Sequence, residues 1–339
     1  MNRLAGVILL VGLMASACNK KPGDESTPPE PDNFAKGADI GWLSEMESKG
    51  IKFYNASGQQ QDCIDLLKQL GVNSIRLRVW VNPLNGWCGK QDVVNQAVRA
   101  SQKGMRILID FHYSDYWADP GKQNKPAAWK PLSFADLNTA LAAHTKEVLT
   151  ALKSNNVQPE WVQVGNEIND GLLWEEGRAS KSMPQFATLV KSGCTAVKEV
   201  FPQSKVIIHV SNGYDNALFR WIMDGLSQNG VSWDVIGMSL YPSVNDWQLK
   251  NGQCLANMQD MINRYGKEIM IAEVGMPVNQ PNACKQFISD LISKTRSLPG
   301  NKGLGVFYWE PQCYNGWQGY QLGAFDDNGR PTAAMDAFK

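Results

Sequence analysis

The sequence contains little histidine, no excess of either charge and no long apolar run. Three of its 339 residues are histidine and its seven cysteines form no CxxC pair, which excludes a structural zinc cluster built from these residues. Lys plus Arg and Asp plus Glu each number 33, without a basic cluster, so no nucleic-acid partner is expected. No stretch reaches the roughly 18 apolar residues of a transmembrane helix.

The chain does have the length and apolar content for a large core. Hydrophobic residues make up 43% of it and charged residues 19%, which is typical of globular proteins. Tryptophan is unusually frequent, with 12 residues.

The N-terminal segment carries the features of an export signal. Arg3 precedes an apolar stretch over residues 4–14, and small residues follow, which predicts a signal peptide over residues 1–17. Cys18 and the Pro-rich, charged stretch after it resemble a bacterial lipoprotein signal with a flexible linker over 18–35. Residues 15–17 also satisfy the plain A-x-A cleavage rule. We expect a lipid anchor at the outer membrane or cell surface, the alternatives being a periplasmic or secreted protein.

The other six cysteines have no informative spacing. They are Cys63, Cys88, Cys194, Cys254, Cys284 and Cys313. In an oxidising compartment they allow many pairings, so a disulfide set and a set of buried free thiols both remain open.

Eight short apolar runs recur from residue 36 onward, and helical patterns separate them. The runs cover residues 37–41, 74–80, 105–112, 161–167, 205–211, 234–241, 268–273 and 304–309. The stretches between them have apolar residues at helical spacing, for example 63–71, 93–104 and 186–201. Repeated strand and helix units predict a parallel sheet.

Eight such units are typical of a (β/α)8 TIM barrel. We therefore expect an α/β fold with a single catalytic domain over residues 36–339 and a last helix at 333–338. An open doubly wound sheet is the structural alternative, but no GxGxxG motif follows the first strand.

The run at 74–80 places two cations inside this barrel. Ile75, Leu77 and Val79 alternate with Arg76 and Arg78, and the outer face of a barrel strand must be apolar. Both arginines should therefore point inward. Because buried charges need partners, this predicts acidic side chains projecting from other strands.

Acidic residues do end four of the predicted strands. They are Asp110, Glu167, Glu273 and Glu310. Active sites of barrels lie at the C-terminal ends of the strands, and the fourth and seventh strands, which end in Glu167 and Glu273, face each other across the ring. Two facing carboxyl groups suit glycoside hydrolysis, in which one protonates the leaving oxygen and the other attacks the anomeric carbon. A separation of about 5 to 5.5 Å would give retention of configuration.

Several motifs at the predicted strand ends carry a family resemblance. They are SIRLRVWVNP (74–83), DFHYSDYWADPGKQNKPAAW (110–129), VQVGNE (162–167), SLYP (239–242) and YWEP (308–311). Together they resemble glycoside hydrolase family 53, the endo-β-1,4-galactanases of clan A. The matches are spread over nearly all of residues 37–311. The loop after the SLYP motif (SVNDW, 243–247) and the strand-seven ending VGMP (274–277) depart from the family pattern.

The resemblance implies a role for each site residue. Glu167 would be the general acid/base and Glu273 the nucleophile. The implied supporting residues are Asn166 for the sugar 2-hydroxyl, Arg76 and Tyr241 for Glu273, His112 and His209 lining the subsite at the scissile bond, and Trp309 beneath the sugar ring. Two further candidates come from the sequence pattern and not from the resemblance. Asp110 lies at the end of its strand, and Trp117 is one of five loop tryptophans, the others being Trp87, Trp129, Trp247 and Trp317.

Structural roles are expected for several other charged residues and for one turn. Glu310 directly follows Trp309, and neighbouring side chains diverge in a strand, so a structural role is favoured for it. Arg78 is expected to form a structural ion pair with Asp110. The segment 324–331 superficially resembles a calcium loop, but a turn at Asn328 and Gly329 fits it better.

These inferences predict a retaining endo-hydrolase of β-1,4-galactan. We expect a monomer that binds galactan and galacto-oligosaccharides and needs no cofactor or catalytic metal, although some galactanases carry a structural calcium. The alternatives are another clan A glycosidase acting on mannan, cellulose or a β-galactoside, and a surface glycan-binding lipoprotein without catalysis.

Overall fold

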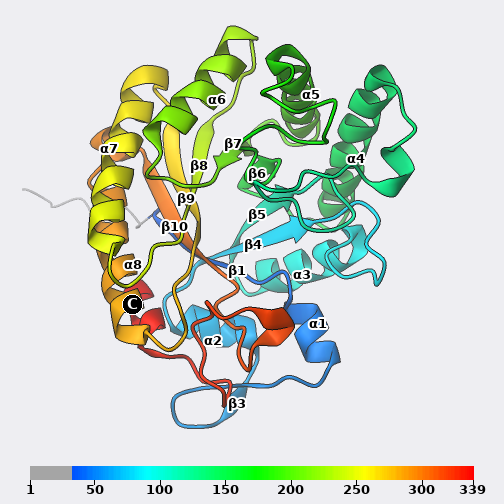
Figure 1. Cartoon of the computed structure of the whole chain (residues 1–339). Helices are drawn as coiled ribbons and strands as arrows, with labels where there is room; N and C mark the ends of the chain where they lie inside the picture. Colours follow the sequence, from blue (N-terminus) through cyan, green and yellow to red (C-terminus); the bar gives the residue numbers. More distant parts are fainter. Residues whose placement is uncertain (1–32) are drawn as a thin grey trace, which may run out of the picture. The chain divides into compact units, whose positions relative to one another are not determined.

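The computed structural model describes residues 33–339, which form a closed (β/α)8 barrel (Figure 1). Within this part of the chain, eight parallel strands pair in the order β1, β10, β9, β8, β7, β6, β5, β4. Their bounds are β1 (Ala35–Asp39), β4 (Ser74–Val79), β5 (Arg106–Phe111), β6 (Trp161–Val164), β7 (Lys205–Val210), β8 (Val235–Leu240), β9 (Glu268–Val274) and β10 (Gly303–Trp309). Because β1 pairs with both β4 and β10, the sheet has no edge, and the open-sheet alternative is wrong.

The predicted strands agree with the observed ones to within a few residues. β6 ends at Val164, three residues before the predicted end, and β1 begins at Ala35, two residues ahead of the predicted run and one ahead of the predicted domain boundary at residue 36. The predicted signal peptide and lipidated cysteine lie outside the described residues.

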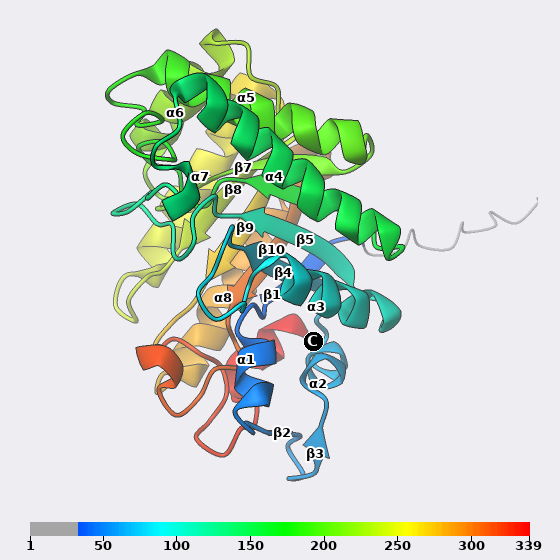
Figure 2. The ribbon, with the colours of Figure 1, turned by 90° about the vertical axis from the view of Figure 1, so that its right-hand side faces the viewer.

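Helices cover the outside of the barrel. They are α1 (Leu43–Ser48), α2 (Cys63–Gln69), α3 (Lys90–Gln102), α4 (Phe134–Ser154), α5 (Met183–Val200), α6 (Asn216–Gln228), α7 (Trp247–Tyr265) and α8 (Pro281–Arg296). Figure 2 shows α3 and α4 lying along the outside of β4 and β5. A short hairpin of β2 (Phe53–Tyr54) and β3 (Gln60–Gln61) adds to the connection between α1 and α2.

The helix ends follow local sequence rules. Ser182 accepts a hydrogen bond at the start of α5, Pro184 occupies its first turn, and Gly266 ends α7 with a φ of 68°. The predicted last helix is present over Ala333–Phe338, but as a 3₁₀ helix (η4) that packs on α8.

A layer of large apolar side chains fills the N-terminal end of the barrel. Its members are Ala35, Leu108, Trp161, Ile207, Val235, Met270 and Phe307, all buried. The Trp161 and Phe307 rings meet edge to face, with centroids 6.3 Å apart. Gly37 lets β1 pass over Phe307, because an added Cβ would lie 2.1 Å from that ring. This end of the barrel is therefore closed, and only the C-terminal end can admit a ligand.

A bulge in β9 determines where Glu273 points. Ile271 packs in the outer core, so strict alternation would turn Glu273, two residues further on, outward as well. The register with β8 instead pairs Met238 with Ile271 and Ser239 with Glu273, which leaves Ala272 unpaired. This extra residue turns the Glu273 side chain into the barrel.

The six described cysteines are all buried and free, which decides between the two possibilities left open by their spacing. No helix within residues 33–339 combines the length and apolar character required to cross a membrane.

Candidate active site

A cavity of about 360 Å³ opens at the C-terminal ends of the strands. It is lined by His112, Trp117, Ala118, Asp119, Asn166, Glu167, Tyr241, Glu273, Trp309, Tyr320 and Leu322. Seven of the ten predicted site residues are among them. The other three, Arg76, Asp110 and His209, are completely buried beneath the cavity.

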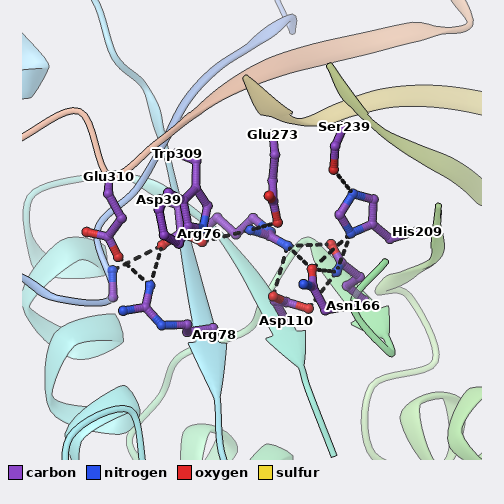
Figure 3. A network of polar contacts seen from close by, with 12 residues as sticks. Asp39, Arg76, Arg78, Asp110, Asn166, His209, Ser239, Glu273, Trp309 and Glu310 are labelled. Atoms are coloured by element: carbon purple, nitrogen blue, oxygen red, sulfur yellow. Dashed lines mark hydrogen bonds and ion pairs between the residues drawn. The ribbon is translucent and has the colours of Figure 1, made fainter. Parts of the chain in front are cut away.

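Arg76 is the centre of the buried network under the cavity (Figure 3). Its Nη1 atom lies 2.8 Å from Asp39 Oδ2 and 2.9 Å from Glu273 Oε1, and its Nη2 atom lies 2.8 Å from Asp110 Oδ2. Nη2 also donates to Asn166 Oδ1 at 2.9 Å. A single guanidinium thus contacts three carboxyl groups. This confirms the prediction that the inward-pointing arginines of β4 have acidic partners on other strands.

Asp39 is a site residue that the sequence reasoning missed. It lies at the end of β1, in register with Arg76 of β4, and it contacts both Arg76 and Arg78. The signal was present in the sequence, since Asp39 is an acidic residue within the first predicted strand.

Glu273 receives two donors. Arg76 contacts its Oε1 atom, and the Tyr241 hydroxyl donates to Oε2 at 2.9 Å. Burial raises the pKa of Glu273, with Arg76 opposing this effect and the nearby carboxyl of Glu167 adding to it.

Glu167 reaches the cavity through a break in the strand. β6 ends at Val164, Gly165 follows with a φ of 85°, and Glu167 itself has a φ of 46°. Strict strand alternation would turn one of the neighbours Asn166 and Glu167 away from the cavity, but the strand ends before them and both line it. Burial raises the pKa of Glu167 to about 7, a hydrogen bond with Ser239 lowers it, and Asp119 raises it. The left-handed backbone conformation is strained for a residue other than glycine, and such strain clusters at functional sites.

The two carboxyl groups of the cavity differ in their surroundings. Burial raises the pKa of both groups, and the charge of Glu167 adds to the rise at Glu273. Arg76 and Tyr241 donate to Glu273, which stabilises the charged form of that group. These donors favour Glu273 as the carboxylate and Glu167 as the carboxylic acid.

His209 lies below the cavity and does not line it, contrary to the prediction. Its Nδ1 atom is 3.0 Å from Asn166 Oδ1, and its Nε2 atom is 2.8 Å from Ser239 Oγ. Burial and the charge of Arg76 lower the pKa of His209 well below its ordinary value, which keeps the ring neutral. Its contacts support Asn166 and the Ser239 hydroxyl from beneath.

His112 does line the cavity, and its orientation is determined by its neighbours. Its Nε2 atom lies 3.0 Å from Asp110 Oδ2, and its Nδ1 atom accepts from the backbone N–H of Ala118 at 3.1 Å. Burial alone would raise the pKa of Asp110, but Arg76 and His112 outweigh burial and lower it. Asp110 therefore stays ionised and holds the imidazole in one tautomer.

Aromatic rings form one wall of the cavity. The ring centroids of Trp309 lie 5.7 Å from Trp117 and 4.8 Å from Tyr320, and the Tyr320 hydroxyl donates to the Trp309 carbonyl at 3.0 Å. Of the five loop tryptophans, Trp117 alone is in the lining. The sequence reasoning missed Tyr320, which lies in a loop far beyond the last strand without a pattern of its own.

Arg78 and Glu310 form a separate buried pair. Arg78 contacts Glu310 and, at 3.3 Å, Asp39, so the expected ion pair between Arg78 and Asp110 is wrong. Asp110 is taken by Arg76, which lies on the same face of β4. Glu310 is completely buried and accepts from the backbone N–H of Trp42, outside the cavity lining.

Residues 33–339 offer no group of three or more His, Cys, Asp or Glu side chains that could hold a metal ion. In the segment first compared with a calcium loop, Asp326 Oδ1 accepts from the backbone N–H groups of Asn328 and Arg330. The N–H of Gly329 donates to the Asp326 carbonyl, so this segment is a turn, as predicted.

Removing the Tyr241 hydroxyl tests its contact with Glu273. Because a hydrogen bond to a charged group contributes about 1.5–3 kcal/mol, Tyr241→Phe is expected to lower kcat by roughly 10- to 100-fold. Tyr214→Phe is the matched control, since the hydroxyl of Tyr214 donates to Asn212 at the surface and its loss should leave kcat unchanged. Equal rates for Tyr241→Phe and the unmodified enzyme would show that this bond does not assist the reaction.

Comparisons with known proteins agree with this geometry. Glycosyl hydrolase family 53 matches residues 35–338. A Neosartorya fischeri protein described as "Probable arabinogalactan endo-beta-1,4-galactanase A" is 34% identical, with 81% of this chain and 83% of the relative covered. The Bacillus subtilis "Endo-beta-1,4-galactanase" is 33% identical over 82% of this chain and 70% of its own length. The solved "Ignisphaera aggregans GH53 catalytic domain" superposes with a TM-score of 0.82 at 32% identity, covering 92% of this chain and 97% of that structure. This chain therefore belongs to glycoside hydrolase family 53.

Proposed function

We propose that this chain is an endo-β-1,4-galactanase that cleaves its polymer with retention of configuration. The observation that carries the proposal is the pair of carboxyl groups in one cavity, of which Glu273 is held by Arg76 and Tyr241. Relatives at 33–34% identity, described as arabinogalactan endo-β-1,4-galactanase or endo-β-1,4-galactanase, support the choice of substrate.

In the first step the Glu273 carboxylate attacks the anomeric carbon, and the bond to the leaving oxygen breaks. Glu167 gives its proton to that oxygen, so the shortened chain leaves as an alcohol and the sugar remains bonded to Glu273. In the second step Glu167, now a carboxylate, takes a proton from water, and the resulting hydroxide equivalent displaces Glu273. Both residues return to their starting states, and the sum is hydrolysis of one bond.

The residues around the pair would orient the sugar. Arg76 and the Ala118 carbonyl hold both ends of the Asn166 side-chain amide, which leaves one N–H to donate to the 2-hydroxyl. Trp309 would lie under the apolar face of the ring, with His112 and Trp117 at its sides. Three residues buried beneath the cavity would hold these side chains in place: Arg76, Asp110 and His209.

The remaining parts of the proposal concern the whole protein. The two carboxyl groups fill both chemical roles, so the reaction as proposed needs no cofactor. We also propose a monomer that is exported and held by a lipid on Cys18, with galactan and galacto-oligosaccharides as its partners.

A reducing-sugar assay on β-1,4-galactan, mannan, xylan and cellulose tests the substrate. The proposal predicts release from galactan well above release from the other three polymers. Equal or greater release from mannan or cellulose would assign the chain a different substrate. No release from any polymer, with binding retained, would favour a glycan-binding protein instead.

Asp119 gives a prediction about pH. Glu167 must be protonated to act as the acid, and its pKa is raised to about 7, so kcat/KM should fall as the pH rises through that value. The negative charge of Asp119 helps to raise this pKa, so Asp119→Asn should move the alkaline limb to lower pH. Asp327→Asn, on an exposed turn outside the cavity, is the control and should leave the limb in place. An unshifted limb in Asp119→Asn would contradict the assignment of Glu167 as the acid.

A further inference from the structure

Arg78 lies at the centre of four tryptophans. Its Cζ atom is 5.0 Å from the ring centroid of Trp42, 5.6 Å from Trp80, 4.5 Å from Trp117 and 5.8 Å from Trp309. All four distances are within the range of cation–π attraction, which is stronger where water is excluded. Arg78 is buried, so these contacts are made away from solvent.

Ion pairs hold the guanidinium in this position (Figure 3). Nη1 contacts both Glu310 and Asp39, and Glu310 is anchored in turn by the backbone N–H of Trp42 and the side-chain amide of Gln312. Within residues 33–339, Nε and Nη2 of Arg78 are buried and have no hydrogen-bond partner. The side of the guanidinium that is not paired with carboxylates is therefore left to the aromatic rings.

The four rings also touch one another and reach the cavity. Trp42 lies 5.3 Å from Trp117 and 5.2 Å from Trp309, and Trp80 lies 5.0 Å from Trp117, measured between centroids. Trp42 and Trp80 are buried, whereas Trp117 and Trp309 line the cavity. A single cation thus contacts both the supporting rings and the two rings that face a ligand.

We propose that Arg78 is a positioning residue for sugar binding, which acts by holding the planes of Trp117 and Trp309 in the cavity wall. The ligand class is a β-linked pyranose chain, whose apolar C–H faces need flat rings at a defined angle. The inference rests on the proposed function for its substrate, but not on the roles of Glu167 and Glu273. Arg78 itself touches neither carboxyl group.

Arg78→Lys is the most direct test. Lysine keeps the charge that pairs with Glu310 but lacks the planar group that stacks against the rings. The variant is expected to raise KM for galactan by roughly 5- to 10-fold while kcat changes less than about twofold, because binding shared by the ground and transition states is lost. A purely structural role would leave KM unchanged in the folded protein.

Arg106→Lys is the matched control. Arg106 also lies over a tryptophan, with Cζ 4.4 Å from the Trp161 centroid, and also pairs with a glutamate, Glu160. It is at the closed, N-terminal end of the barrel, so its replacement should leave KM as it is. Equal changes in KM for the two variants would overturn the proposal.

A second variant keeps the proposal testable if Arg78→Lys does not fold. Arg78→Met with Glu310→Gln removes both buried charges together, and such paired replacement often preserves folding. It should show the same rise in KM, and a KM within twofold of the unmodified enzyme would refute the proposal. If galactan is not hydrolysed, the proposed substrate is wrong. KM of the variants is then compared on whichever β-1,4-glycan the unmodified enzyme does hydrolyse.

Discussion

Replacing Glu273 with alanine is expected to lower kcat on galactan by roughly 10⁴-fold or more, because the group that forms the covalent bond is gone. Affinity for the polymer should remain within a few-fold, since the aromatic wall and the residues around Glu167 are untouched. Single-turnover kinetics and equilibrium binding of a galacto-oligosaccharide measure the two effects separately. Activity above a few per cent of the unmodified enzyme would mean that Glu273 is not the nucleophile.

Azide distinguishes the two carboxyl groups from each other. On an activated aryl β-galactobioside, azide should take the place of the missing Glu273 carboxylate and form the α-glycosyl azide. The matched variant Glu167→Ala still forms the glycosyl-enzyme, so azide should displace Glu273 and give the β-glycosyl azide. The opposite pair of products would exchange the two roles.

Replacing Arg76 with methionine should destabilise the fold as well as abolish activity. It leaves three carboxyl groups without their shared cation, and breaking a buried ion pair from one side costs about 3–5 kcal/mol. Arg99→Met is the control, because Arg99 also contacts two carboxylates, Glu47 and Asp62, but is partly exposed, and such pairs contribute about 1 kcal/mol or less. Urea unfolding at pH 7 measures both losses.

The pH dependence of the Arg76→Met effect has a defined sign. Arg76 lowers the pKa of Asp110 in the folded protein, so its contribution is present above the unfolded pKa of an aspartate and is lost as the pH falls through the folded pKa. The difference in unfolding free energy between the enzyme and the variant should therefore shrink in acid. A difference that grows as the pH falls would contradict the ion-pair account.

Most of the fold could be predicted because the local signals agree with one another. The alternation in residues 74–80 places two arginines inside the barrel, and the structure supplies carboxylates for both. Strand starts and ends were predictable to a few residues because each barrel strand is a short and predominantly apolar run between polar segments. The last helix is a 3₁₀ helix, and a segment of six residues does not distinguish an α-helix from a 3₁₀ helix by its sequence.

The arrangement within the site was harder to predict because it depends on register. The bulge that turns Glu273 inward is visible only in the pairing of β9 with its neighbours. His209 is buried below the cavity instead of lining it. The depth of a side chain in the barrel depends on the stagger between neighbouring strands, which the sequence of a single strand does not reveal. Which carboxylate meets Arg78 likewise follows from three-dimensional neighbours, and a loop residue such as Tyr320 enters the site without any sequence signal.

Proton NMR of the first products of galactan hydrolysis tests the central claim most directly. If Glu273 and Glu167 act from opposite sides in two displacements, the new reducing end must appear first as the β-anomer, with the α-anomer growing only later by mutarotation. Initial formation of the α-anomer would mean a single displacement by water and would contradict the account.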